Sequence, residues 1–197
     1  MRETERTPEK ERELHIMTSC DGNLIPSLSV LLHSIGRNLR DRRVHFYLMH
    51  SRVGEEELER LRLQCARYGN LEFCPVAVPV IPEFILLEQL GKWNGQGWPE
   101  EAYYPLAAWK FLPESLDRVL YLDAGDTLVL GEIDDYYFGS FQGCSLRVTG
   151  GVFKKSADPI GGGGINSPGK RRPGEGGISS GVRTRGIQFR LLYAEPG

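Results

Sequence analysis

Apolar residues between positions 14 and 150 follow two alternating periods, and each period predicts one kind of element. Short apolar runs bounded by turn formers predict strands at residues 14–19, 44–50, 71–78, 118–123 and 144–148. Apolar residues at steps of three and four predict helices that follow the first two of these strands. The buried stripe of the first helix is Leu24, Leu28, Leu31, Leu32, Ile35 and Leu39. The stripe of the second, within residues 54–69, is Leu58, Leu61, Cys65 and Tyr68.

The order strand, helix, strand, helix, strand predicts an α/β fold with a mainly parallel sheet, because parallel neighbours need crossover connections of about a dozen residues. Pro75 places the third strand at an edge or a bend of that sheet. Residues 81–101 are rich in Pro, Gly and Trp and predict a loop, and residues 102–116 predict a helical stretch.

Composition divides the chain of 197 residues into three parts. Residues 1–13 form a charged leader, and residues 14–150 have enough apolar residues for one globular domain. Residues 151–197 hold 12 of the 24 glycines and eight Lys or Arg against three Asp or Glu. A segment with so little apolar periodicity does not bury enough surface to offset its ordering entropy, so we expect this tail to be disordered.

Several classes of partner and location are disfavoured by the composition. A net charge of -2 gives no general attraction to nucleic acid. No run approaches the roughly 18 apolar residues of a membrane span, and the leader lacks the apolar core of a signal peptide, which favours a cytoplasmic location. The four cysteines are widely spaced, so we interpret Cys20, Cys65, Cys74 and Cys144 as reduced core thiols.

The run "VLYLDAGDTLVL" at positions 119–130 places Asp123 and Asp126 where an apolar strand ends. Ligands bind at the carboxyl ends of strands in open α/β sheets, and Gly125 permits a tight turn between the two carboxylates. A divalent cation such as Mn²⁺ or Mg²⁺ would offset their repulsion and hold a nucleotide diphosphate. The alternative interpretation is that Asp123 caps a turn and Asp126 is solvated.

Two segments of the chain resemble glycosyltransferase family 8, whose members are retaining enzymes with a GT-A fold that use UDP-sugars. "DRVLYLDAGDTLVLGEID" resembles the metal-binding segment of that family, and "IMTSCDGNLIPSLSVLLHSI" is similar to its first strand and nucleotide-binding turn. The resemblance covers residues 14–148 and implies a Rossmann-like sheet flanked by helices, with a truncated or disordered C-terminal part.

The resemblance also implies roles for individual residues. Asp21 would meet the uracil ring, Asn23 would lie near the ribose or phosphates, and the backbone at Ser19 and Cys20 would face the base. Asp123 and Asp126 would hold Mn²⁺ or Mg²⁺. The implied reaction transfers a hexose to a carbohydrate or glycolipid acceptor, with possible peripheral membrane contact, and the family's usual bacterial setting is the assembly of surface polysaccharide.

Three features depart from the family pattern. The usual Asp-x-Asp pair is one residue longer here, and Pro105 stands where the family has an arginine, for which Lys110 is a candidate substitute. The family's later histidine and lysine should lie beyond residue 150, and all four histidines of this chain lie within its first 50 residues. "ISSGV" at 178–182 resembles an acceptor-side segment of the family.

Two other functions are compatible with parts of the sequence. "LDAGDTLV" can be compared with the nucleophile segment of haloacid-dehalogenase phosphatases, although Gly125 stands where their second aspartate belongs. The chain can also be an inactive or incomplete nucleotide-sugar-binding remnant. Hydrolysis of a sugar nucleotide in the presence of Mn²⁺ distinguishes the transferase from both.

Overall fold

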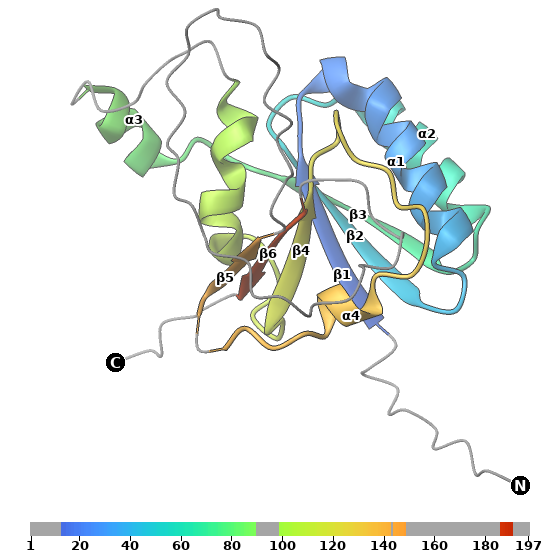
Figure 1. Cartoon of the computed structure of the whole chain (residues 1–197). Coiled ribbons are helices and arrows are strands. Elements are labelled where there is room, and N and C mark those ends of the chain that lie inside the picture. Colours follow the sequence, from blue (N-terminus) through green and yellow to red (C-terminus); the bar gives the residue numbers. More distant parts are fainter. Residues whose placement is uncertain (1–12, 90–98, 143, 149–185, 191–197) are drawn as a thin grey trace, which may run out of the picture.

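The computed structural model describes residues 13–89, 99–142, 144–148 and 186–190. Six strands form one sheet in the order β3-β2-β1-β4-β6-β5 (Figure 1). The strands are β1 Glu13–Ser19, β2 Arg43–His50, β3 Leu71–Ala77, β4 Arg118–Leu122, β5 Leu146–Val148 and β6 Gly186–Arg190. The helices are η2 Gly22–Leu24, α1 Ile25–Asn38, α2 Glu55–Ala66, α3 Pro82–Gln89, η3 Glu100–Lys110 and α4 Asp134–Tyr137.

Four strands, β3, β2, β1 and β4, run parallel, as the alternation of strands and helices predicts. Their carboxyl ends therefore meet at one edge of the sheet. β3 is the edge strand, in agreement with the position of Pro75, which pairs in register with Leu48. The mainly parallel α/β prediction is confirmed.

The two remaining strands run antiparallel to their neighbours. β6 pairs with β4 on one side and with β5 on the other. β6 lies in the Gly/Arg-rich tail, so the expectation of disorder is wrong for residues 186–190. The rest of 151–197, including "ISSGV", lies outside the described residues, as do residues 1–12 of the leader.

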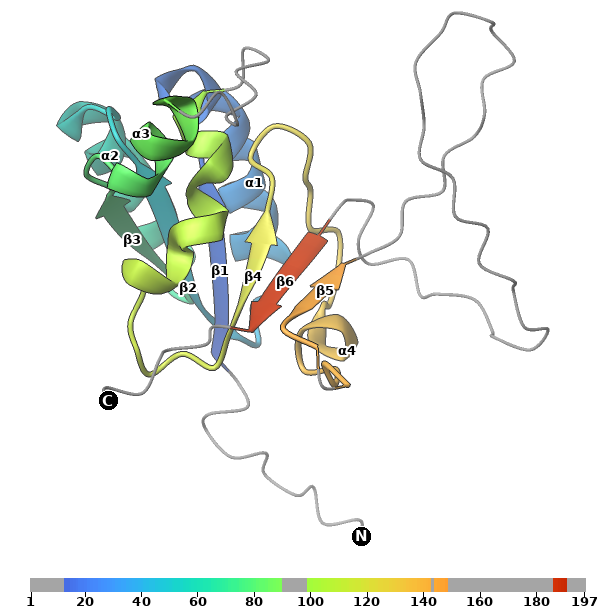
Figure 2. The same ribbon diagram turned by 90° about the vertical axis from the view of Figure 1, so that its left-hand side faces the viewer.

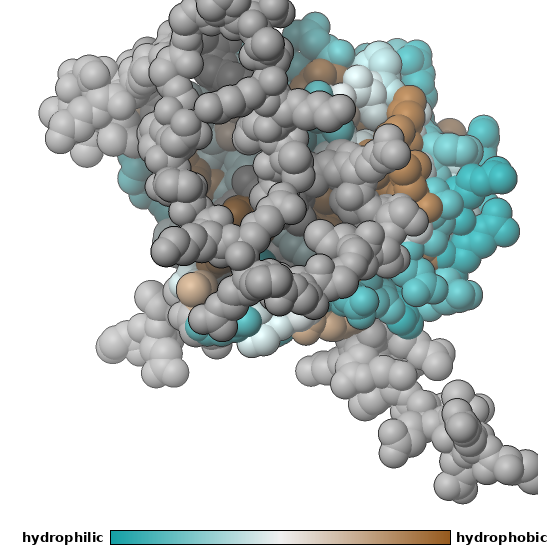
Figure 3. All heavy atoms as spheres, in the orientation of Figure 1, coloured by the Kyte–Doolittle hydropathy of each residue, from teal (hydrophilic) through white to brown (hydrophobic). Residues whose placement is uncertain are grey.

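Helices cover both faces of the sheet, and each face has its own core (Figure 2). α1 and α2 cover one face, where the predicted stripe residues Leu28, Leu31, Leu32, Ile35 and Leu39 of α1 and Leu58, Leu61 and Cys65 of α2 are buried. η3 packs on the other face through Tyr104, Ala107 and Ala108. In Figure 3 the surface on the α1 and α2 side is mostly hydrophilic.

The second face differs from expectation in two places. Residues 82–89 form α3 inside the segment for which we predicted a loop. The helical stretch around Pro105 is a 3-10 helix from Glu100 to Lys110. Pro105 lacks an N–H and therefore donates no backbone hydrogen bond within this helix. Trp93 and Trp98 lie outside the described residues.

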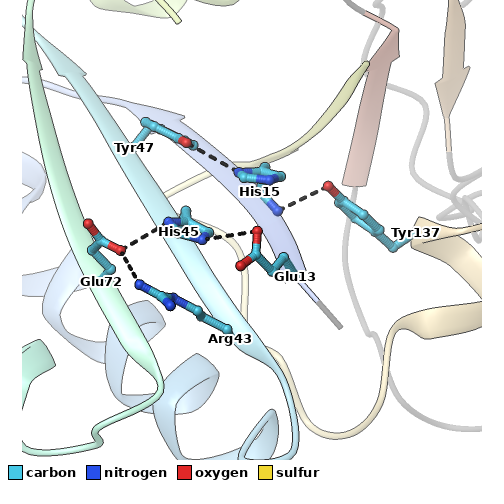
Figure 4. Close-up of polar contacts among 7 residues, drawn as sticks. All are labelled: Glu13, His15, Arg43, His45, Tyr47, Glu72 and Tyr137. Carbon is cyan, nitrogen blue, oxygen red and sulfur yellow. Dashed lines mark hydrogen bonds and ion pairs between the residues drawn. The ribbon is translucent and has the colours of Figure 1, made fainter. Parts of the chain in front are cut away.

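A polar network crosses the amino ends of β1, β2 and β3 (Figure 4). The His45 imidazole lies between Glu72, 3.1 Å away, and Glu13, 3.6 Å away. His15 Nδ1 lies 3.2 Å from the Tyr47 hydroxyl oxygen, and the His15 N–H donates to the Tyr137 hydroxyl at 3.0 Å. This network is at the edge of the sheet opposite the carboxyl ends of the parallel strands.

All four cysteines are free thiols, as expected. Cys20 and Cys65 are buried and Cys74 is half-buried, but Cys144 is exposed, so the interpretation as a core thiol is wrong there. Within the described ranges no helix is long and apolar enough to cross a membrane.

Candidate functional site

The turn that follows β1 holds Asp21 in a fixed conformation. The Asp21 side chain caps η2 because its Oδ1 accepts from the Asn23 N–H at 3.0 Å. Its Oδ2 accepts from Asn23 Nδ2 at 2.9 Å. Each carboxylate oxygen keeps a further lone pair for a ligand. Asp21 and Asn23 thus form one preorganised unit at the carboxyl end of β1.

The turn that follows β4 carries Asp123 and Asp126. Asp123 Oδ1 accepts from the Gly125 N–H at 2.8 Å, so Asp123 does cap this turn, as the alternative interpretation predicts. Capping occupies one oxygen and is compatible with metal binding by the other. Gly125 permits this turn, and a Cβ there would meet only ordinary contacts, at 3.4 Å from Asp123 Oδ1 and 3.8 Å from Leu24 Cδ2.

The structure brings these two turns together. β1 and β4 are neighbours in the sheet, with Ile16 opposite Leu120 and Met17 opposite Tyr121. The side chain of Leu24 from the first turn reaches the Gly125 position of the second, as the 3.8 Å approach shows. The backbone of Ser19 and Cys20 ends β1 on the same rim, and the Cys20 N–H donates to the Met49 carbonyl at 3.4 Å.

A third carboxylate, Glu101, belongs to this rim and was missed from the sequence. Glu101 lies in the first turn of η3 and is only 6% exposed. It accepts from the Oγ of Ser51, the residue after β2, at 2.5 Å. Acidic residues are common in the first turn of any helix, so Glu100 and Glu101 carry no distinctive signal in the sequence.

The carboxylates near the end of β1 also affect the pKa values of buried groups there. Burial is the main cause that raises the pKa of Cys20 to about 12, and Asp21, Glu101 and Asp123 raise it further. Burial and then Asp123 raise the pKa of Tyr121 to about 12. Cys20 therefore stays a protonated thiol near neutral pH and is not a nucleophile.

The donor set on this rim fits a hard divalent cation. Mg²⁺ and Mn²⁺ take oxygen ligands and commonly use one or two carboxylates, with water and phosphate oxygens as the remaining ligands. Asp123 and Asp126 lie on one four-residue turn and supply such oxygens. In the described part of the chain, no group of three or more His, Cys, Asp or Glu side chains is arranged to hold a metal ion, so a cation here would depend on its non-protein ligands.

Two cavities of about 910 and 890 Å³ lie away from this rim. Arg40, Arg43 and Asn70 contribute to the first, and Glu13, His15 and Asp117 contribute to the second. Both therefore lie near the amino ends of the parallel strands, where the topology of an open α/β sheet does not place ligands.

Two further charged residues, Asp134 and Lys110, form ion pairs within the fold. Asp134 pairs with Arg42, so it is not available as a metal ligand, and its neighbour Asp135 is exposed. Lys110, the candidate substitute for an arginine at Pro105, pairs with Glu83 of α3 and lies 5.5 Å from the centre of the Trp109 ring. Lys110 therefore points toward α3, where it pairs with Glu83.

Comparison with known proteins places this arrangement in a family. Comparison of the sequence with curated proteins gave no match. Among solved structures, the galactosyltransferase LgtC, in complex with donor and acceptor sugar analogues, is 20% identical with a TM-score of 0.51, covering 68% of this chain and 45% of its own. The glycosyltransferase GlyE of Streptococcus pneumoniae TIGR4 is 16% identical with a TM-score of 0.53, and the match covers 91% of this chain and 34% of GlyE.

These structural likenesses support the GT-A type of fold, and this chain spans less than half the length of either protein. The sequence itself matches the family model "Glycosyl transferase family 8" over residues 15–149. That match covers most of the chain, including both turns of the candidate site. The chain belongs to glycosyl transferase family 8.

Proposed function

We propose that this chain binds a UDP-sugar at the rim formed by the two turns and transfers its hexose, with retention, to a carbohydrate or glycolipid acceptor. The observation that carries the proposal is the approach of the two turns, since Leu24 Cδ2 of the first lies 3.8 Å from the position that a Cβ on Gly125 of the second would occupy. The pairing of β1 with β4 supports it too, because the Asp21 unit and the Asp123–Asp126 turn follow these neighbouring strands at the edge of the sheet where ligands bind.

Each residue of the rim has a distinct role in this proposal. Asp21 accepts from the uracil ring, Asn23 lies near the ribose or phosphates, and the backbone of Ser19 and Cys20 faces the base. Asp123 and Asp126 hold Mn²⁺ or Mg²⁺. The cation, when bound, offsets the negative charge of the diphosphate as it leaves.

The setting of the reaction is part of the proposal. A cytoplasmic location with peripheral membrane contact suits a glycolipid acceptor. The residues that would contact the acceptor in the family pattern come after residue 150, outside the described residues apart from β6. We therefore name no catalytic residue.

A second candidate function is that of an incomplete nucleotide-sugar-binding remnant. This chain spans 45% of the length of LgtC and 34% of the length of GlyE. The remnant would bind the donor without transferring the sugar. The phosphatase alternative has no support from the family match or from the fold.

Calorimetric titration with UDP, with and without Mn²⁺, tests the proposed site. We expect UDP to bind only when Mn²⁺ is present, and Asp123→Asn to weaken that binding by at least about tenfold, because it removes a charged ligand. Asp135→Asn is the matched control, since Asp135 is exposed and lies outside the rim.

Two outcomes contradict the site assignment. One is UDP binding that is independent of metal, and the other is an Asp123→Asn variant that binds as the wild type does. Hydrolysis of a UDP-sugar with Mn²⁺ then distinguishes an active transferase from a remnant that only binds.

A further inference from the structure

The segment that follows Asp126 is hydrogen-bonded to α1 through the backbone of Val129. Val129 is fully buried, whereas its neighbours Leu128 and Leu130 are 42% and 52% exposed. Figure 3 shows a hydrophobic strip beside α1, where this segment passes. The two leucines are thus less buried than Thr127, which is 5% exposed, and Val129, so Thr127 and Val129 are the residues that attach the segment to the domain.

Two polar side chains of α1 bind both backbone groups of Val129. The Val129 N–H donates to Ser34 Oγ at 3.0 Å, and Asn38 Nδ2 donates to the Val129 carbonyl at 2.8 Å. Ser34 and Asn38 are four residues apart, which puts them on one face of the helix. A buried backbone group without a partner is costly, so these two bonds keep Val129 in place.

Both side chains are themselves fixed by α1. Ser34 Oγ donates to the Leu31 carbonyl at 2.7 Å, and Asn38 Nδ2 also donates to the Ser34 carbonyl at 3.0 Å. Ser and Asn are weaker helix formers than Ala or Leu, and of the two only Ser34 is buried. Their presence here is explained by what they bind outside the helix.

The turn is thus held at both ends. On its first side, Leu122 is paired in β4 and Asp123 accepts from Gly125. On its second side, Val129 is bound to α1 only three positions after Asp126. The two attachments limit the positions that Asp126 can take relative to Asp123.

We propose that Ser34 and Asn38 are positioning residues. They hold the Asp123–Asp126 turn in a conformation in which both carboxylates can bind the same cation. This inference rests on the proposed function, because that proposal supplies the cation. The attachment of the turn to α1 is observed in the structure. Groups that orient metal ligands from outside the coordination shell commonly change metal affinity by about 10- to 100-fold when they are removed.

The test compares Asn38→Asp with Asn70→Asp. Asn70 Nδ2 likewise donates to two backbone carbonyls, of Leu39 at 2.8 Å and Arg42 at 3.3 Å, but neither carbonyl belongs to the segment 123–129. In both variants a carboxylate faces a carbonyl in place of an amide donor, so both should lose stability. We expect only Asn38→Asp to raise the Mn²⁺ concentration needed for half-maximal UDP binding, by about 10- to 100-fold.

A second measurement needs neither metal nor nucleotide. Hydrogen exchange of the backbone amides from 123 to 129 should accelerate in Asn38→Asp and in Ser34→Ala. It should stay at the wild-type rate in Asn70→Asp and in Ser34→Thr, which keeps the hydroxyl. Equal shifts of the Mn²⁺ requirement in Asn38→Asp and Asn70→Asp, or unchanged exchange in Asn38→Asp, overturn the inference.

The two measurements separate this inference from the proposed function. A wild-type chain that binds no UDP at any Mn²⁺ concentration overturns the proposed function. In that case the exchange rates still decide whether Ser34 and Asn38 hold the turn.

Discussion

The imidazole of His15 lies in a partly buried polar network at the amino end of β1. His15 stacks on His45 of β2 with ring centroids 4.8 Å apart, and the Tyr47 and Tyr137 hydroxyls contact His15 from β2 and α4. Burial is the main cause that lowers the pKa of His15, and His45 lowers it further, while Glu13 and Asp117 oppose the change. Protonation of His15 is therefore unfavourable in the folded chain.

We expect the free energy of unfolding to decrease as the pH falls below about 6.5, the ordinary pKa of histidine in an unfolded chain. The unfolded chain then binds a proton that folded His15 resists, so acid favours unfolding, and the stabilisation is fully present above that pH. His15→Gln should flatten part of this dependence. The remaining pH dependence should come from His50, because burial also lowers the pKa of that residue.

Urea unfolding between about pH 8 and pH 5 measures this dependence. His33→Gln is the control, since His33 is an exposed histidine on α1. The prediction fails if His15→Gln has the same pH dependence as the wild type.

The residues near the site show which parts of a binding site can be predicted from the sequence. Asp21, Asn23, Asp123 and Asp126 could be chosen because strand ends and turn formers are visible along the chain. Glu101 could not, because its position beside the rim depends on how η3 packs against the end of β2. Contacts between distant segments leave no periodic signal.

Among the helices, α1 and α2 approach each other closely at Gly36. A Cβ built on Gly36 would lie 2.4 Å from the ring of Tyr68, which follows α2. Tyr68 also holds α1 through its hydroxyl, 2.6 Å from His33 Nδ1. The absence of a side chain at Gly36 lets the tyrosine ring pack directly on the helix backbone.

We expect Gly36→Ala to destabilise the chain by about 1–3 kcal/mol, because a methyl group forced into a packed contact costs more than helix propensity returns. Gly22→Ala is the matched control, since a Cβ at Gly22 would meet nothing within 4 Å. Urea unfolding of both variants measures the difference. An equal or higher stability for Gly36→Ala would contradict the packing argument.

The sequence predicted the helices and strands of the parallel part of the sheet because their apolar periods are long and regular. It missed α3, whose residues we assigned to a loop on the strength of nearby Pro, Gly and Trp. It also missed β6, since Gly186–Arg190 is a short strand inside a glycine-rich tail and is stabilised by pairing with β4 and β5.

At the scale of the whole molecule, β6 connects the tail to the domain. A chain that ends at Val148 would lose β6 and leave one edge of β4 open. β5 would also lose the strand with which it pairs. An open edge presents unpaired backbone groups to other chains.

We therefore expect the chain that ends at Val148 to unfold at a lower urea concentration, with a loss of at least about 2 kcal/mol, and to self-associate. A chain that lacks only residues 191–197 keeps β6 and is the control. Urea unfolding and light scattering measure the two effects. Equal stability of both shortened chains would show that β6 contributes little.

The position of β6 inside the sheet also has a consequence for synthesis on the ribosome. β4 and β5 are made well before β6, yet β6 lies between them, and residues 123–185 separate the paired ends of β4 and β6. Pairings between such distant residues form slowly. The sheet is therefore complete only after β6 has been made, and any protein that shields exposed strands during that interval would act on the open edge of β4.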